Sequence, residues 1–148
     1  MITNRSSIHF GNDSQISIGV LFSQNGPMAV TEKAHLKGTL MAVDEINENG
    51  GIGGLLLNPI VEDPKSDPAI YRELAKKLLT QDQVSVIFGC CASANRKALL
   101  PIVERHGVLL IYPSFYEGFE YSPNIVYAGA TPNQTVVPLV EFLFRNYG

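Results

Sequence analysis

Three short apolar segments between residues 84 and 128 constrain the fold of this chain most strongly. They are rich in Val and Ile, and each ends near a glycine or a proline: Val84–Phe88, Val108–Tyr112 and Ile125–Ala128. Segments of this kind, bounded by turn-forming residues, are typical of β-strands that are buried on both faces. Parallel sheets bury both faces because helices cover them, so the pattern predicts an α/β fold.

Two earlier strands and four helices complete the predicted pattern. We expect the strands at Ile16–Phe22 and Leu55–Glu62, and the helices at residues 30–49, 68–80, 93–106 and from about residue 135 onward. Pro101 should end or kink the third helix, and Pro138 is tolerated only if the last helix begins late, near Thr135. Right-handed crossovers then give a doubly wound parallel five-stranded sheet, in the order 2-1-3-4-5, with helices on both faces.

Length and composition indicate one globular domain. The chain has 148 residues, of which 45% are hydrophobic and 17% charged, as expected for a folded domain with a core. A net charge of −3 argues against nucleic acid as a direct partner, and no apolar segment approaches the roughly 20 residues that a membrane-spanning helix needs. The polar residues 1–15 are interpreted as a lead-in or a tag, and residues 16–148 as the domain.

The same composition bears on compartment and cofactors. Residues 1–15 lack the apolar middle of a signal peptide, which predicts a cytoplasmic protein; the alternative is a periplasmic protein whose signal was removed. Cys90 and Cys91 are adjacent, so they are expected to be free thiols. Because the histidines are scattered, no metal-ligand spacing is present and no cofactor is expected.

Several polar motifs have a structural explanation. The glycines of residues 50–54 follow a helix and precede a strand, whereas a nucleotide-binding loop follows a strand and opens a helix. Asp63 and Asp67 are interpreted as turn formers, with Asp67 capping the second helix. Because the sequence has neither a Gly-x-Ser-x-Gly motif nor a convincing acid pair, we predict that the protein is not an enzyme.

A ligand site is predicted where the strands end. In open parallel sheets, ligands bind beyond the carboxyl ends of the strands, so three segments should share one edge: Cys90–Ser93, Pro113–Gly118 and Ala130–Gln134, together called the rim. Ser93 is expected to cap the third helix and to offer a hydroxyl and backbone N–H groups to a ligand carbonyl. The alternatives are that Ser93 only caps its helix and that Tyr112 belongs only to the core.

Two neighbouring segments are given structural roles. Arg96 and Lys97 are interpreted as a solvated helix face rather than an anion site. The segment Tyr116–Glu120 is interpreted as structural, because Glu117 can accept hydrogen bonds from the local backbone.

Three longer stretches carry a resemblance to a known family. IGVLFSQNGPMAV, GCCASANRKALLPIVER and YPSFYEGFEYSPNIVYAGATPNQ resemble the short-chain amide and urea binding proteins of the type I periplasmic-binding-protein superfamily. The likeness runs from Ile16 to Gly148 and is nearest to the amide-sensor branch, which negatively regulates aliphatic amidase expression. It implies that this chain is the N-terminal lobe of a two-lobed protein, with the ligand held in the cleft between this lobe and a missing second lobe.

The resemblance also implies a function and site residues. The ligand would be a small neutral amide or urea, sensed in order to control a regulatory protein. The alternative is a periplasmic substrate-binding component of an ABC transporter for urea, short amides or branched-chain amino acids, with a membrane permease as partner. A third hypothesis is a flavodoxin-like enzyme, whose sheet has the same strand order. The ligand-binding residues expected from the rim and the resemblance are Cys91, Ser93, Tyr112, Pro113, Ser114 and Thr131. Relatives have an aromatic residue at the position of Cys91 and the amide sensor has threonine at that of Ser114, so a roomier pocket is expected.

Overall fold

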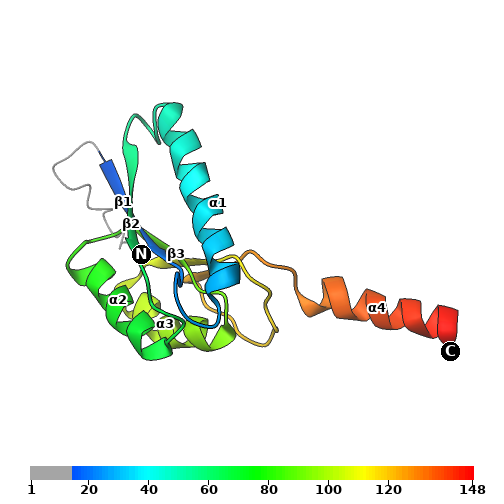
Figure 1. Cartoon of the computed structure of the whole chain (residues 1–148). Helices are drawn as coiled ribbons and strands as arrows, with labels where there is room; N and C mark the ends of the chain where they lie inside the picture. Colours follow the sequence, from blue (N-terminus) through cyan, green and yellow to red (C-terminus); the bar gives the residue numbers. More distant parts are fainter. Residues whose placement is uncertain (1–14) are drawn as a thin grey trace, which may run out of the picture.

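The structure is a computed structural model that describes residues 15–148 (Figure 1). The predicted lead-in, residues 1–15, therefore lies almost wholly outside the described residues. Nine helices and strands are seen in this part of the chain, in the order β1 Gln15–Leu21, α1 Ala29–Glu48, β2 Leu56–Glu62, α2 Pro68–Thr80, β3 Val86–Gly89, α3 Ser93–His106, β4 Leu109–Tyr112, β5 Ile125–Tyr127 and α4 Pro132–Tyr147.

The five strands form one parallel sheet in the order β2-β1-β3-β4-β5, which confirms the predicted fold class and strand order. Helix α1 covers one face, and α2 and α3 lie together against the opposite face (Figure 1). Successive residues of a strand point to opposite faces. Val20 of β1 accordingly packs with Leu36 of α1, while Leu21 packs with Leu78 of α2. The domain therefore has two apolar layers, one on each side of the sheet.

Local polar contacts fix the loops as the sequence suggests. The carboxylate of Asp67 accepts hydrogen bonds from the amides of Ala69 and Ile70 at the start of α2, so the predicted cap is confirmed. Asp63 accepts from the amide of Gln24 at 2.8 Å and from its own loop, and so ties the β1–α1 loop to the β2–α2 loop. At Gly51, where φ is +76°, an added Cβ would lie 2.1 Å from a backbone oxygen, so this turn requires glycine.

One expectation about proline is wrong: α4 begins at Pro132 rather than near Thr135, with Pro138 inside it. Helix α3 runs over the predicted residues 93–106, so Pro101 does not end it. The early start of α4 follows from a capping box at Thr131, in which the backbone amide of Thr131 donates to the Gln134 side chain at 3.0 Å. Pro132 then occupies the first turn, where a missing N–H leaves no hydrogen bond unmade.

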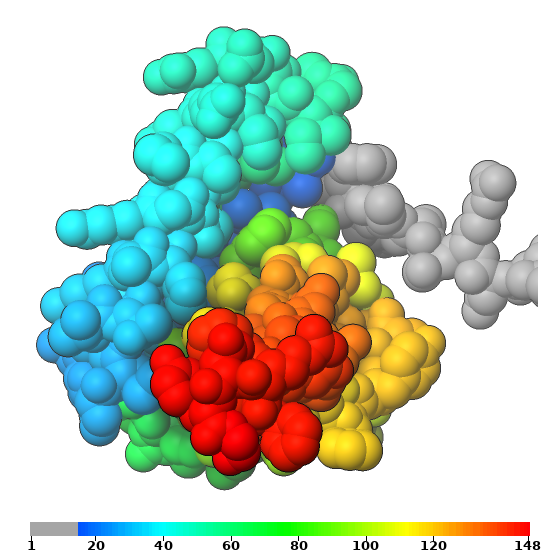
Figure 2. All heavy atoms as spheres, turned by 90° about the vertical axis from the view of Figure 1, so that its right-hand side faces the viewer, coloured from blue at the N-terminus to red at the C-terminus, as the bar shows by residue number. Residues whose placement is uncertain are grey.

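Helix α4 projects away from the sheet, and Figure 2 shows it end-on from its carboxyl side. From Asn133 to the end of the chain every residue is exposed. The exposed set includes large apolar side chains, namely Val136, Val137, Leu139, Val140, Phe142, Leu143, Phe144 and Tyr147. Even so, none of the helices within residues 15–148 is both long and apolar enough to span a membrane. The apolar face of α4 is thus left without a partner inside this domain.

Candidate functional site

The structure brings the loops that follow β1, β3, β4 and β5 to one edge of the sheet. The amide of Cys90 donates to the Leu21 carbonyl at 3.2 Å, and the amide of Ala128 donates to the Tyr112 carbonyl at 2.9 Å. The amide of Tyr116 reaches the Ala130 carbonyl at 3.5 Å. Because the strands are parallel, their carboxyl ends meet, and the rim segments predicted from the sequence lie together at that edge.

Cys91 and Ser114 are neighbours across the rim. The sulfur of Cys91 lies 3.5 Å from the hydroxyl oxygen of Ser114, and both side chains are half-buried. The backbone of Gly129 packs directly on this loop, since an added Cβ would lie 1.9 Å from the Ser114 carbonyl oxygen. A thiol and a hydroxyl are thereby held side by side, as small and partly exposed polar groups.

Tyr112 is fully buried and braces two loops. Its hydroxyl donates to the carbonyl oxygens of Cys91 at 2.7 Å and Phe115 at 3.0 Å. Burial raises the pKa of Tyr112, so the hydroxyl keeps its proton. The hydrogen of this hydroxyl is thus used inside the protein, and Tyr112 shapes the rim by holding the β3–α3 loop against the β4–β5 loop.

The remaining predicted residues lie at the margins of this group. Pro113 follows β4 and lines an apolar groove of about 460 Å³ that runs along α1, together with Phe88 and His35. The hydroxyl of Thr131 contacts Asn133 and Gln134 at the start of α4. Thr131 therefore caps α4, and its neighbour Ala130 makes the backbone contact to the rim.

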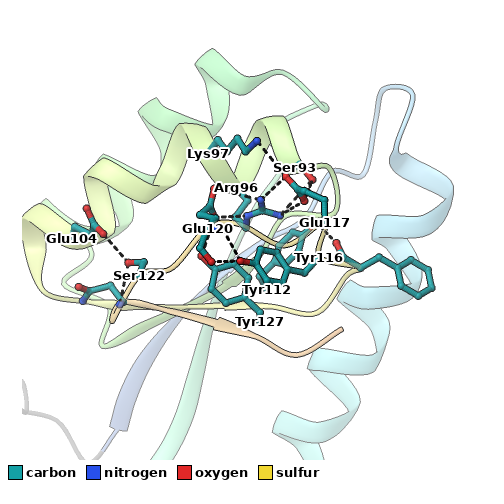
Figure 3. Close-up of polar contacts among 12 residues, drawn as sticks. Ser93, Arg96, Lys97, Glu104, Tyr112, Tyr116, Glu117, Glu120, Ser122 and Tyr127 are labelled. Carbon is teal, nitrogen blue, oxygen red and sulfur yellow. Dashed lines mark hydrogen bonds and ion pairs between the residues drawn. The ribbon is translucent and has the colours of Figure 1, made fainter. Parts of the chain in front are cut away.

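Ser93 is the first residue of α3 but is not its N-cap, so that expectation is wrong. Ala92 occupies the N-cap position, with φ −80° and ψ 141°. The hydroxyl of Ser93 donates instead to Oε2 of Glu117 at 2.7 Å (Figure 3). The first turn of α3 still presents backbone N–H groups to the edge of the sheet, as any helix start does.

Arg96 is not part of a solvated face, which corrects the interpretation from the sequence. Its side chain is completely buried and forms ion pairs with two carboxylates of the β4–β5 loop (Figure 3). Nη2 lies 2.9 Å from Oε1 of Glu117, and Nε lies 2.8 Å from Oε1 of Glu120. The neighbouring Lys97 does extend into solvent, although it also pairs with Glu117 at 3.2 Å.

Three tyrosine rings surround the Arg96 guanidinium. The distances from its central carbon to the ring centroids are 4.8 Å for Tyr112, 5.4 Å for Tyr116 and 5.6 Å for Tyr127. Cations over aromatic faces are attracted by the ring quadrupole. We call this set the arginine cluster; its members are Arg96, Tyr112, Tyr116, Glu117, Glu120 and Tyr127. It joins α3, β4, β5 and the loop between the last two strands.

The cluster sets the charge state of both loop carboxylates. Hydrogen bonds from Arg96 and Ser93 hold the pKa of Glu117 far below its usual range. Burial works to raise the pKa of Glu120, but hydrogen bonds from Arg96 and Tyr127 outweigh it, and the pKa is lowered. Both groups are therefore ionised at neutral pH. The Tyr116–Glu120 segment, interpreted from the sequence as structural, is held chiefly by Arg96.

Reasoning from the sequence missed the arginine cluster. A usable signal was present in residues 116–127, where two acids three positions apart alternate with tyrosines. Such a loop requires a buried cation, because packed carboxylates need a charge partner. The helix before β4 offers two arginines, Arg96 and Arg105, and Arg96 is the one that lies at its start, three residues after Ser93.

Comparison with known proteins identifies the family. A model of the periplasmic binding protein domain matches residues 16–148. The chain is 32% identical over 99 residues to the leucine-, isoleucine-, valine-, threonine- and alanine-binding protein of Pseudomonas aeruginosa, an alignment that covers 67% of this chain and 26% of the relative. It therefore spans about a quarter of that relative's length.

Solved structures agree with this match. The isoleucine-bound substrate-binding protein LivJ of a branched-chain amino acid transporter from Streptococcus pneumoniae superposes with a TM-score of 0.68 and 35% identity, covering 70% of this chain and 30% of LivJ. A solute-binding protein of an ABC transporter from Rhodopseudomonas palustris BisB5, in complex with 3,4-dihydroxybenzoic acid, has a TM-score of 0.81. That match covers 91% of this chain and 37% of the other, but at 22% identity it shows the fold alone.

These proteins bind solutes, in agreement with the prediction that this chain is not an enzyme. The family match extends over the whole sheet, the rim and α4. The finer likeness to the amide sensors is not among these findings. The chain belongs to the periplasmic binding protein domain family.

Proposed function

We propose that this chain is one lobe of a solute-binding protein that serves as the substrate-binding component of an ABC transporter. The observation that carries the proposal is the rim, where Cys91 and Ser114 present small polar groups at the carboxyl edge of a parallel sheet. The relatives support transport, since LivJ belongs to a branched-chain amino acid transporter. This favours a periplasmic protein with a membrane permease as partner over the cytoplasmic sensor expected from the sequence.

The ligand that suits this rim is small and polar. Ser114 and the first turn of α3 supply hydrogen-bond donors, and a second lobe would close over them by a hinge motion. We propose a short neutral amide or urea as the ligand, with branched-chain amino acids as the alternative that the relatives' ligands suggest. A single lobe offers half of such a cleft, so it should bind weakly alone.

Calorimetry on a protein that carries both lobes tests this proposal, with acetamide, urea and leucine as ligands. Ser114→Ala should weaken binding about fivefold, because the loss of one hydrogen bond to a ligand is worth about 1 kcal/mol. Ser85→Ala is the matched control, since Ser85 is exposed just before β3, at the opposite end of the strand. Binding that is equal in all three proteins would remove Ser114 from the site.

The choice between transport and sensing needs a cellular test. If the proposal is right, deletion of the gene abolishes uptake of radiolabelled ligand, and restoring the gene restores uptake. Unchanged uptake, combined with ligand-dependent expression of an amidase reporter, would instead support the sensor and its regulatory partner.

A further inference from the structure

The hydroxyl of Ser93 has its hydrogen committed to a carboxylate. It donates to Oε2 of Glu117 at 2.7 Å and accepts from Nη1 of Arg96 at 3.4 Å (Figure 3). A serine hydroxyl has one hydrogen and two acceptor lone pairs. With the hydrogen and one lone pair used inside the protein, a single lone pair is left for a ligand.

The direction of this hydrogen bond is fixed by the groups around Glu117. Arg96 donates to both oxygens of Glu117, at 2.9 and 3.2 Å, and Lys97 lies 3.2 Å from Oε1. These cations keep Glu117 ionised, as the lowered pKa of this side chain also indicates. An ionised carboxylate only accepts hydrogen bonds, so it cannot return a hydrogen to Ser93. The other carboxylate beside Arg96, that of Glu120, is likewise ionised.

We propose that Glu117 is a positioning residue that fixes the Ser93 hydroxyl as an acceptor, so that this lobe selects ligand N–H groups over ligand carboxylates. This inference rests on the proposed solute-binding function. Glu117 is 43% exposed at the rim, with its charge already paired with Arg96 and Lys97. A carboxylate ligand would bring only acceptors to Ser93, whose hydrogen is already used. The NH₂ group of an amide or of urea would instead donate to the free lone pair.

Isosteric ligands test the inference in a protein that carries both lobes. Acetamide and acetate have the same size and differ in the N–H donors and the charge, so the ratio of their affinities at pH 7 measures the selection. We expect the wild-type protein to prefer acetamide at least about tenfold, the factor that one unmade hydrogen bond produces. Equal affinity for the two compounds would overturn the proposal.

Glu117→Gln examines the source of this preference. The glutamine NH₂ would donate to Ser93 and release the serine hydrogen toward the ligand, and the negative charge would be gone. The acetamide-to-acetate ratio should therefore fall about tenfold relative to the wild type. Glu104→Gln is the matched control, because Glu104 binds Ser122 at 2.8 Å on another part of α3, and it should leave the ratio unchanged. An unchanged ratio in Glu117→Gln would refute the role of Glu117.

A measurement without ligand separates this inference from the proposed function. Carboxyl ¹³C NMR of the protein gives the apparent pKa of Glu117, which Ser93→Ala should raise if the serine donates to it. A pKa that does not move in Ser93→Ala would overturn the positioning role, whether or not any solute binds. A pKa that rises, in a protein that binds neither compound, would uphold the Ser93–Glu117 arrangement and refute only the amide form of the proposed function.

Discussion

Replacing Arg96 by methionine should remove about 3–5 kcal/mol from the free energy of unfolding. The Arg96 side chain is fully buried, and Glu120, its partner at 2.8 Å, is only 15% exposed. Removing one member of such a pair leaves an uncompensated charge in a poorly solvated place, which costs about 3–5 kcal/mol. Methionine keeps most of the apolar stem, so the loss reports on charge and hydrogen bonds rather than on a cavity.

The two carboxylates should contribute unequally to this loss. Glu117 is 43% exposed, and ion pairs at exposed positions contribute only about 0–1 kcal/mol. The coupling energy between Arg96 and Glu120 should therefore exceed that between Arg96 and Glu117. Double-mutant cycles with Glu120→Gln and Glu117→Gln measure both energies. In the cycle with Glu120, the double variant should recover part of the stability, because no unpaired charge is left.

Urea unfolding followed by circular dichroism is the assay, with Lys97→Ala as the control. Lys97 is adjacent to Arg96 but its side chain is 59% exposed, so its removal should change the unfolding free energy by less than about 0.5 kcal/mol. An Arg96→Met protein within about 1 kcal/mol of the wild type would refute the reasoning. So would a coupling with Glu117 that is larger than the coupling with Glu120.

Three further predictions use the same unfolding measurements. Gly129→Ala should destabilise the domain, because the new Cβ would lie 1.9 Å from the Ser114 carbonyl oxygen, whereas Gly38→Ala, with nothing within 4 Å, should stabilise α1 by about 0.5–1 kcal/mol. The buried carboxylate of Glu32 in α1 accepts hydrogen bonds from the Ser23 amide and the Tyr71 hydroxyl. Glu32→Ala should lower the unfolding free energy by about 1–3 kcal/mol, because it leaves these two buried donors unpaired. An unchanged unfolding midpoint would contradict this. Because the loop carboxylates have lowered pKa values, their stabilisation should be present above about pH 4.3 and be lost as the pH falls below it; this acid dependence should shrink in Arg96→Met.

The fold could be predicted because its signals are local. A buried parallel strand needs a short run of apolar residues and a turn residue after it, and β3 and β4 show both within five positions. Asp67 before Pro68 marks the start of α2, and Gly107, with φ +65°, closes α3 as a left-handed residue. Each of these features depends on a few neighbouring residues, so the five strands and the first three helices could be predicted without knowledge of their tertiary contacts.

The site was less predictable because its contacts are not local. Arg96 lies on a face of α3 that resembles a solvated one until the β4–β5 loop, more than twenty positions later, supplies two carboxylates. The rings around Arg96 come from this loop and from the two strands that flank it. The Ser93 hydroxyl donates to Glu117 of the same loop, while Ala92 stands at the N-cap of α3. A loop has no periodicity, so its two acids indicate that it needs a cation, but the pattern does not say which element supplies it.

If the rim binds a solute, as proposed, the arginine cluster should matter for binding even though most of it is buried, because it organises the rim before a ligand arrives. Ordering a loop on binding subtracts from affinity, so a loop that is already held binds more tightly with the same contacts. Here Arg96 holds the β4–β5 loop through Glu120, and the Tyr112 hydroxyl holds the start of the loop through the Phe115 carbonyl. This loop carries Ser114. Affinity in this lobe should therefore depend on residues that no ligand can touch. It follows that Arg96→Met should weaken ligand binding even in the fraction that remains folded.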